Sequence, residues 1–337
     1  MNSDHPPTDP EKALLLALQR GIPITRRPWM EIATPLGRTE ADVLLAGKDL
    51  FTRGIARRFG AVFDSRRLGY SSTLCAVDVP AGDIERVAAM FQPHPGVTHC
   101  YEREGKPDLW FTLTAPADKL DDELAKLRRA LAPDILLNLP ASRRFKVEVV
   151  LDAGSGDVEP AHGEIIPSAA IGNTPPTFDG RGKDLIRKLQ GNLPLVEEPF
   201  TDIANDLKWE YDKLIDTLTA WKRAGIIRRI GFILRHREAG FVANGMCVWP
   251  VAADDVERAG KTLAGAPEVT HCYERSSSPA VPFNLYAMIH ARARPEAEAT
   301  FRRLSEKAGL TGGRMLVSVR EFKKSSPVFF METESGT

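Results

Sequence analysis

The chain has 337 residues, of which 43% are hydrophobic and 27% are charged, as expected for a globular protein with full cores. Basic and acidic residues both number 45, and this zero net charge argues against a protein that lives on nucleic-acid phosphates. No apolar run approaches the ~20 residues that span a bilayer, and the polar, proline-rich residues 1–10 do not resemble a signal peptide, so we expect a cytoplasmic protein without a membrane partner.

The first elements expected along the chain are helices. Apolar periodicity predicts a helix over residues 11–20, a second from Pro28, and a third over residues 39–53. Thr39 fits an N-cap, and Asp42 three residues later offers a capping-box partner. The arrangement is a helix-turn-helix in outline.

Strand and helix patterns alternate after these helices. A short wing-like segment at 56–64 comes first. We then expect a strand at 70–79, a helix at 81–91, strands at 97–103 and 109–113, a helix at 118–131 and a strand at 145–151. After the wing, this order is β-α-β-β-α-β, the ferredoxin-like plan.

The second half of the chain repeats the first. Thr98–Arg103 recurs letter for letter as Thr270–Arg275, about half the chain length later. Shorter matches extend the repeat, such as Gly54-Ile55 with Gly225-Ile226. We therefore predict an α+β tandem duplication, in which each half is a helix-turn-helix domain followed by a ferredoxin-like βαββαβ domain.

Domain boundaries follow from the repeat. Residues 153–182 are rich in Gly, Pro, Ser and Ala without periodicity, which is typical of a flexible linker. The expected helix-turn-helix domains cover 10–64 and 183–235, and the expected ferredoxin-like domains cover 65–152 and 236–330.

The repeated hexapeptide is the main candidate for chemistry. Side chains alternate between the two faces of a strand, so His99, Tyr101 and Arg103 are expected on one face. Their counterparts in the second copy are His271, Tyr273 and Arg275. Each face offers an imidazole for acid–base work or metal binding, a phenol, and a cation that can bind a carboxylate.

A second polar cluster precedes the first strand of each ferredoxin-like domain. Its members are Ser65, Arg66 and Arg67 in the first half, and Arg235, His236 and Arg237 in the second. A solvated basic turn would account for it, but at the edge of the same sheet it also suits a polyanionic ligand. Because Ser65 stands where the second half has His236, we expect unequal halves, with the second better equipped.

Other residues carry weaker signals. Trp110 and Tyr286 fall in predicted strands, where core packing or an aromatic pocket would occupy them. His94 and His290, like His5 and His162, are interpreted as loop or surface residues. The four cysteines are expected to be buried in a reducing compartment, and they lack a metal-binding spacing: Cys75, Cys100, Cys247 and Cys272.

The whole pattern resembles the Lrp/AsnC architecture and, more closely, the siroheme decarboxylases of haem d1 and alternative haem biosynthesis. In the first half the resemblance rests on Arg57–Asp64 with Leu68-Gly69-Tyr70, and on Val97–Arg103 with Leu109–Leu113. In the second half it rests on Arg228–Gly231, Arg235–Ala243 with Met246 and Trp249, and His271–Arg275 with Asn284-Leu285. The family often works as two related subunits, and this chain resembles the two fused head to tail.

The resemblance implies an activity and a set of site residues. It implies removal of CO2 from two acetate side chains of siroheme to give didecarboxysiroheme, with siroheme as the substrate and no further cofactor. His236 and His271 would be catalytic or contact the iron of the bound substrate, and His99 would be the corresponding group of the first half. The other substrate-binding residues would be Arg66, Arg67, Tyr101, Arg103, Trp110, Arg235, Arg237, Tyr273 and Arg275.

Two other functions stay open. A DNA-binding regulator of this architecture would place a recognition helix in the major groove, where the acidic residues of these helices would repel the duplex. These residues are Glu40, Asp42, Asp49, Glu210, Asp212 and Asp216. A tetrapyrrole carrier or sensor would bind with the same histidines and return its ligand unchanged. The two halves would form an internal pseudo-dimer, and further pairing into a homodimer stays open.

Overall fold

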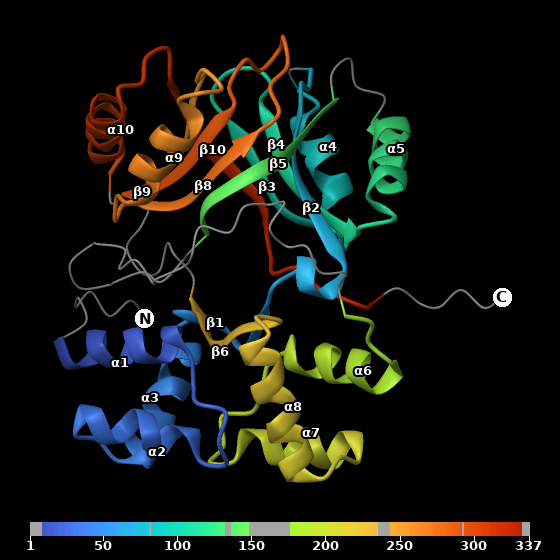
Figure 1. The fold of residues 1–337 in the computed structure, drawn as a ribbon, viewed down its shortest axis with the longest axis vertical. Helices are drawn as coiled ribbons and strands as arrows, with labels where there is room; N and C mark the ends of the chain where they lie inside the picture. The colour runs from blue at the N-terminus through green and yellow to red at the C-terminus, as the bar shows by residue number, and fades with distance from the viewer. Residues whose placement is uncertain are drawn as a thin grey trace.

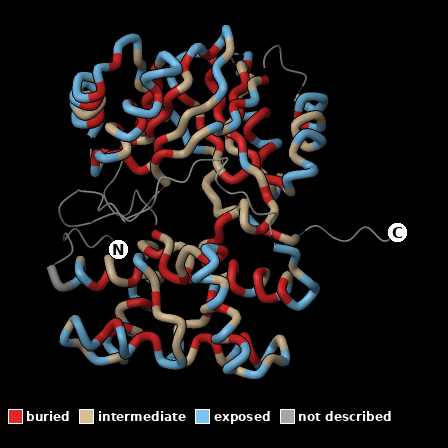
Figure 2. Tube along the Cα trace, in the orientation of Figure 1, coloured by how far each residue is buried: buried red, intermediate tan, exposed pale blue. Residues whose placement is uncertain are grey.

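The structure, a computed structural model, describes residues 9–80, 82–131, 136–147, 176–234, 243–291 and 293–331. A layer of helices lies at one end of the molecule and a β-barrel with outer helices lies at the other (Figure 1). A two-stranded ribbon runs between them. Buried residues line the barrel strands and the inner sides of the helices, while the outer sides are exposed (Figure 2).

The helical layer contains both helix-turn-helix units. Its helices are α1 (Asp9–Arg20), α2 (Pro28–Ala33), α3 (Glu40–Thr52), α6 (Gly180–Leu189), α7 (Pro199–Leu207) and α8 (Tyr211–Arg223), with a 3-10 turn at Thr34–Leu36. The predicted capping box is confirmed, because the Thr39 side chain accepts from the Asp42 N–H and the Asp42 carboxylate accepts from the Thr39 N–H. This exchange satisfies backbone donors at the start of α3.

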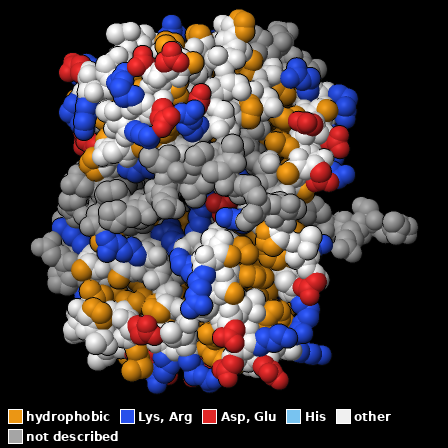
Figure 3. All heavy atoms as spheres, in the orientation of Figure 1, with side chains coloured by type: hydrophobic (Ala, Val, Ile, Leu, Met, Phe, Trp, Pro, Cys, Tyr) orange, Lys and Arg blue, Asp and Glu red, His pale blue; other side chains and the backbone are white. Residues whose placement is uncertain are grey.

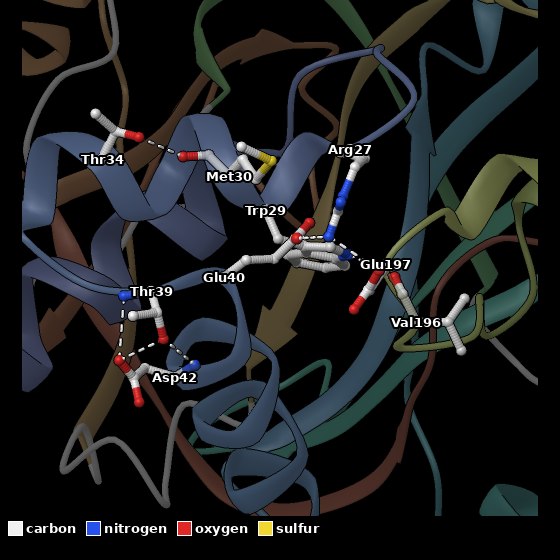
Figure 4. Close-up of polar contacts among 9 residues, drawn as sticks. All are labelled: Arg27, Trp29, Met30, Thr34, Thr39, Glu40, Asp42, Val196 and Glu197. Carbon is white, nitrogen blue, oxygen red and sulfur yellow. Dashed lines mark hydrogen bonds and ion pairs between the residues drawn. The ribbon is translucent and has the colours of Figure 1, made fainter.

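The two units share one hydrophobic core. Phe59 of the first half and Phe232 of the second lie with ring centroids 5.1 Å apart, and Trp29 packs on both. The Trp29 indole N–H donates to the Val196 carbonyl at 2.6 Å. Figure 4 shows Arg27 reaching both Glu40 and Glu197, the latter at 2.9 Å. The helix-turn-helix units are therefore packed against each other within one chain.

The wing-like segments pair with each other to form the ribbon, defined here as β1 (Ala56–Phe63) and β6 (Ile227–Leu234). They run antiparallel, with Gly60 opposite Gly231. A Cβ atom on Gly60 would lie 2.4 Å from the Gly191 carbonyl oxygen. One on Gly231 would lie 2.8 Å from the Leu18 carbonyl oxygen. Glycine at these two positions lets the C-terminal ends of α6 and α1 approach the ribbon closely.

Within the described residues, eight strands form a closed barrel, in the order β10-β3-β4-β2-β5-β8-β9-β7. The first half supplies β2 (Tyr70–Val77), α4 (Ile84–Phe91), β3 (Val97–Arg103), β4 (Leu109–Pro116), α5 (Leu120–Leu131) and β5 (Leu136–Val147). The second supplies β7 (Ala243–Trp249), α9 (Val256–Ala264), β8 (Val269–Arg275), β9 (Leu285–Ala291), α10 (Arg294–Ala308) and β10 (Arg314–Lys324). The ferredoxin-like order is confirmed in both halves.

Two strands join the halves. β5 pairs with β2 of its own half and then with β8 of the other, and β10 pairs likewise with β7 and β3. This double pairing explains why the strand predicted at 145–151 begins earlier, at Leu136. Pro140 and the charged residues after it interrupt the alternation that marks a strand in sequence. Residues 148–151 lie outside the described part of the chain.

The barrel separates two kinds of core. Helices cover its outside, where the four cysteines are buried as predicted. Trp110, Tyr286 and Met246 pack inside the barrel, and the Trp110 indole N–H donates to the Pro107 carbonyl at 2.7 Å. Helix α6 begins at Gly180, inside the predicted linker, whose residues 153–175 are not described. No helix in the described segments is both long and apolar enough to cross a bilayer.

Candidate active site

The two copies of the hexapeptide lie on opposite sides of the barrel, on β3 and β8, which are four strands apart in either direction. His99 pairs in register with Lys324, the last residue of β10. The Lys324 carbonyl accepts a 3.0 Å hydrogen bond from Arg57 of the ribbon. The charge of Arg228, also of the ribbon, acts on His271, so both histidines lie at the end of the barrel that faces the ribbon.

Each strand presents its histidine, tyrosine and arginine as a ladder on one face, as the alternation predicts. In the first ladder the His99 and Tyr101 ring centroids are 6.3 Å apart, and the Arg103 guanidinium lies 5.3 Å from the Tyr101 ring centroid. In the second, the corresponding distances for His271, Tyr273 and Arg275 are 6.2 Å and 4.7 Å. Cys100 and Cys272 point to the opposite face, into the outer cores.

The arginines at the inner ends of the ladders are cations without a carboxylate partner among the described residues. Arg103 donates to the Leu316 carbonyl at 2.9 Å, and Arg275 donates to the Leu139 carbonyl at 2.8 Å. The Nε atoms of both are buried with no hydrogen-bond partner in the described part of the chain. Burial lowers the pKa of Arg103 to about 10. Buried cations of this kind favour an anionic ligand, which would offset their desolvation.

The ladder histidines are held at Nδ1. Each Nδ1 lies 3.0 Å from the hydroxyl of the preceding threonine, Thr98 for His99 and Thr270 for His271. Burial and neighbouring Lys324 lower the pKa of His99 to about 3. Burial and neighbouring Arg228 lower the pKa of His271 to about 4. The two imidazoles are also near enough for the charge of His271 to act on His99, and pKa values this low make both neutral at pH 7.

A third histidine belongs to this site, and the interpretation of His290 as a loop or surface residue is wrong. His290 is a half-buried residue of β9. Burial lowers its pKa to about 3, and the charges of His271, Lys324 and Arg103 add to the effect. His290 was missed by the sequence analysis because its neighbours in the sequence are apolar. The period-two spacing from Tyr286, which packs inside the barrel, was the signal that it faces inward.

The ribbon and β5 add charges that sequence reasoning did not place in the site. Arg228 of β6 donates to the Asp64 carboxylate at 2.7 Å. Arg144 of β5 pairs in register with Tyr273, and its Nη2 lies 3.9 Å from the same carboxylate. On the face drawn in Figure 3, Lys and Arg side chains gather where the helical layer meets the barrel.

The remaining predicted residues divide into three groups. Arg66 lies on the 3-10 turn Arg66–Leu68 beside Asp64, and half-buried Arg67 follows it. Trp110 lies in the inner barrel core. The predicted residues Arg235, His236 and Arg237 lie outside the described residues. The described residues contain no cluster of three or more His, Cys, Asp or Glu side chains that could hold a metal ion, so iron contact by His271 and His236 stays a prediction.

Comparison with known families places this architecture. A model described as a siroheme decarboxylase NirDL-like HTH domain matches residues 11–57 and 182–228. One described as an AsnC-like ligand binding domain matches 67–146 and 238–323. A siroheme decarboxylase of Hydrogenobacter thermophilus is 36% identical over 321 residues, covering 95% of this chain and 94% of the relative. The chain belongs to the siroheme decarboxylase family.

Solved structures agree with this assignment. The crystal structure of the siroheme decarboxylase NirDL superposes with a TM-score of 0.74 at 31% identity, covering 95% of this chain and 94% of the other. A co-complex of NirDL with an iron-uroporphyrin III analogue superposes with a TM-score of 0.73 at 30% identity, covering 95% of each chain. The resemblance to the siroheme decarboxylases is confirmed.

Some members of the siroheme decarboxylase family match only one half of this chain. The siroheme decarboxylase beta subunit of Methanosarcina barkeri is 38% identical over 141 residues, covering 42% of this chain and 93% of the subunit. The alpha subunit of Desulfovibrio desulfuricans is 40% identical over 140 residues, covering 41% of this chain and 80% of the subunit. The present chain thus carries within one polypeptide two units that correspond to separate subunits elsewhere.

Proposed function

We propose that the chain is a carboxy-lyase that removes CO2 from two acetate side chains of siroheme and gives didecarboxysiroheme. The observation that carries this proposal is the convergence of two His-Tyr-Arg ladders at one end of the barrel. Unpaired buried guanidinium nitrogens at the inner ends of these ladders suit a ligand with several carboxylates. The iron tetrapyrrole is the substrate in this proposal, and its conjugated ring supplies the electron sink.

The reaction asks two things of the protein. When an acetate loses CO2, the carbon–carbon bond breaks, and its electron pair stays on the methylene carbon and spreads into the ring. One proton then converts the methylene into a methyl group. Arg103 and Arg275 would bind carboxylates that do not react and so orient the ring, and a histidine would deliver the proton.

The low pKa of the histidines fits this role once the substrate is present. Burial and then Arg228, Arg275 and Lys146 hold the pKa of His271 at about 4. Carboxylates of the substrate among these cations would oppose their charge and raise the pKa of the imidazole. Substrate binding would therefore be linked to protonation of the residue that gives the proton.

The two ladders are not equivalent, which supports the proposal that the second carries more of the turnover. His271 has a second imidazole, His290, within electrostatic reach, whereas the equivalent of His290 in the first half is Thr114. His99 instead pairs with Lys324, and the equivalent partner of His271 is Val147. The second half thus supplies two of the three imidazoles that interact at this end of the barrel, His271 and His290, which supports our proposal that it is the better equipped half.

Anaerobic incubation of the purified chain with siroheme tests the function directly. Product mass and absorption spectrum are followed together, and loss of two carboxyl groups is the expected result. Tight binding with an unchanged mass would replace the proposal with a tetrapyrrole carrier or sensor. Absence of binding would favour a regulator of the same architecture.

A further inference from the structure

One buried carboxylate lies within the cationic surroundings of the second ladder. Asp64 follows the last residue of β1 and is 9% exposed. Its Oδ1 accepts from the Arg66 backbone N–H at 3.0 Å, and its Oδ2 accepts from Arg228 at 2.7 Å. Arg144 adds an ion pair at 3.9 Å. This carboxylate therefore joins the turn after β1 to side chains from β6 and β5.

The charges around Asp64 do not balance. Two guanidinium groups, those of Arg228 and Arg144, face one carboxylate, and Nη1 of nearby Arg66 is buried without a hydrogen-bond partner among the described residues. Burial alone would favour the neutral acid, but Arg228 and Arg144 outweigh it and keep the pKa of Asp64 below its usual range. Asp64 is therefore ionised at neutral pH, and an excess of positive charge is left beside it.

The arginines held by Asp64 belong to the second ladder. Arg144 pairs in register with Tyr273. The charge of Arg228 is the second-largest cause, after burial, of the low pKa of His271. Asp64 contacts neither ladder residue itself. Its influence on them passes through the two arginines.

At the positions of Asp64 and Arg144, the other half of the chain carries residues of the opposite charge. Glu321 occupies the place of Arg144 opposite the tyrosine of the first ladder, and its side chain is exposed. Arg235 is the residue that aligns with Asp64, and it lies outside the described residues. The Asp64 arrangement therefore distinguishes the second ladder from the first by sign of charge.

We propose that Asp64 is a positioning and specificity residue of the second ladder. It fixes Arg144 and Arg228 beside Tyr273 and His271, and it occupies hydrogen-bonding capacity that would otherwise attract a further substrate carboxylate. The part of this proposal that concerns turnover rests on the proposed function. The part that concerns anion binding does not.

The test is Asp64→Asn, which keeps an oxygen for the Arg66 N–H and removes the charge. Iron uroporphyrin III is titrated by absorbance at several salt concentrations, and kcat and KM for siroheme are measured on the same protein. We expect binding to tighten about three- to tenfold with steeper salt dependence, because two arginines lose their internal counter-charge. We expect kcat to fall about tenfold, because these arginines are no longer fixed.

Two further variants separate charge from structure. Asp64→Glu keeps the charge, so it should not tighten binding even where its extra length lowers kcat. Asp206→Asn removes a surface carboxylate that pairs with Lys188 at 2.7 Å, and it should leave binding and kcat unchanged.

Opposite shifts in affinity and kcat support the proposal. Unchanged affinity, or weaker binding with a parallel loss of kcat and melting temperature, would overturn it and leave Asp64 a merely structural residue. If the wild-type chain binds iron uroporphyrin but does not decarboxylate siroheme, the proposed function fails, and the binding comparison still decides the role of Asp64.

Discussion

Histidine in this site is held by its own neighbour in the chain. Each ladder histidine bonds through Nδ1 to the hydroxyl of the residue before it, so the hexapeptide carries its own orienting group. Nε2 is then the ring nitrogen that a substrate would meet. This local arrangement accounts for the recurrence of Thr directly before His in both halves.

The first prediction at this scale concerns the two ladder histidines. His271→Ala should abolish nearly all turnover of siroheme. The expected fall in rate is about 10²- to 10⁴-fold, as for loss of a general acid. His99→Ala should have a smaller effect, because the first half has Thr114 at the position where the second half has His290. Single-turnover assays at saturating siroheme would measure both. Equal losses would show that the halves contribute alike.

The second prediction concerns stability in acid. Histidines with a folded pKa of about 3 to 4 bind protons less readily than the unfolded chain, whose histidines titrate near pH 6.5. Their contribution to stability is therefore complete above pH 6.5 and is lost as pH falls toward 3 to 4, with a slope of about 1.4 kcal/mol per pH unit for each histidine. Urea unfolding of His290→Thr between pH 7 and 4.5 should show a shallower slope than the wild type. An identical slope would mean that His290 is not held neutral in the folded protein.

At the scale of elements, the ribbon connects the two halves, because each of its strands binds a helix of the other half. Arg58 of β1 donates to the Gln190 carbonyl at the end of α6, and Arg229 of β6 donates to the Gln19 carbonyl at the end of α1. Arg57 and Arg228, one position earlier in each strand, act instead on the site. The ribbon thus uses its alternation to bind helix ends with one face and to complete the site with the other.

The third prediction follows from the close approach of helix ends to this ribbon. Gly60→Ala and Gly231→Ala should each cost about 2 kcal/mol or more of unfolding free energy, because the new methyl would meet backbone carbonyls. Gly180→Ala is the matched control, since nothing lies within 4 Å of a Cβ there. Urea unfolding measures all three. A cost at Gly180 equal to that at Gly60 would contradict the argument.

Elements were predictable from sequence where the determining information is local. The order of strands and helices in each half, the capping box of α3 and the burial of the cysteines follow from periodicity and turn chemistry within short windows. The early start of β5 at Leu136 was not, because this strand is fixed by partners from both halves. His290 was missed because its neighbours are apolar, although its spacing from Tyr286 carried the necessary information.

At the scale of the whole molecule, neither half is complete. Each ferredoxin-like unit leaves strand edges and one apolar sheet face that only the other unit covers. Closure of the barrel depends on pairing between sequence-distant strands, which periodicity does not reveal. The internal pseudo-dimer is therefore a single folded body.

The fourth prediction is that the two halves assemble when they are produced together as separate fragments, whereas neither half is stable alone. Residues 1–152 and 153–337, produced together, should copurify in equal amounts and retain turnover, since relatives exist with separate subunits. Either fragment alone exposes the face that buries Trp110 or Tyr286, and it should aggregate or pair with itself. Light scattering after size-exclusion chromatography measures the outcome. A stable monomeric fragment would contradict it.

The position of β10 has a consequence for biosynthesis. This strand ends at Lys324, in the second half of the chain, yet it supplies one of the two partners of β3 and the residue opposite His99. During translation, the β3 ladder is made long before this partner leaves the ribosome. One edge of β3 therefore stays unpaired until β10 has been synthesised, and a chain terminated before β10 lacks part of the site. The candidate site is therefore complete only after β10 has been made.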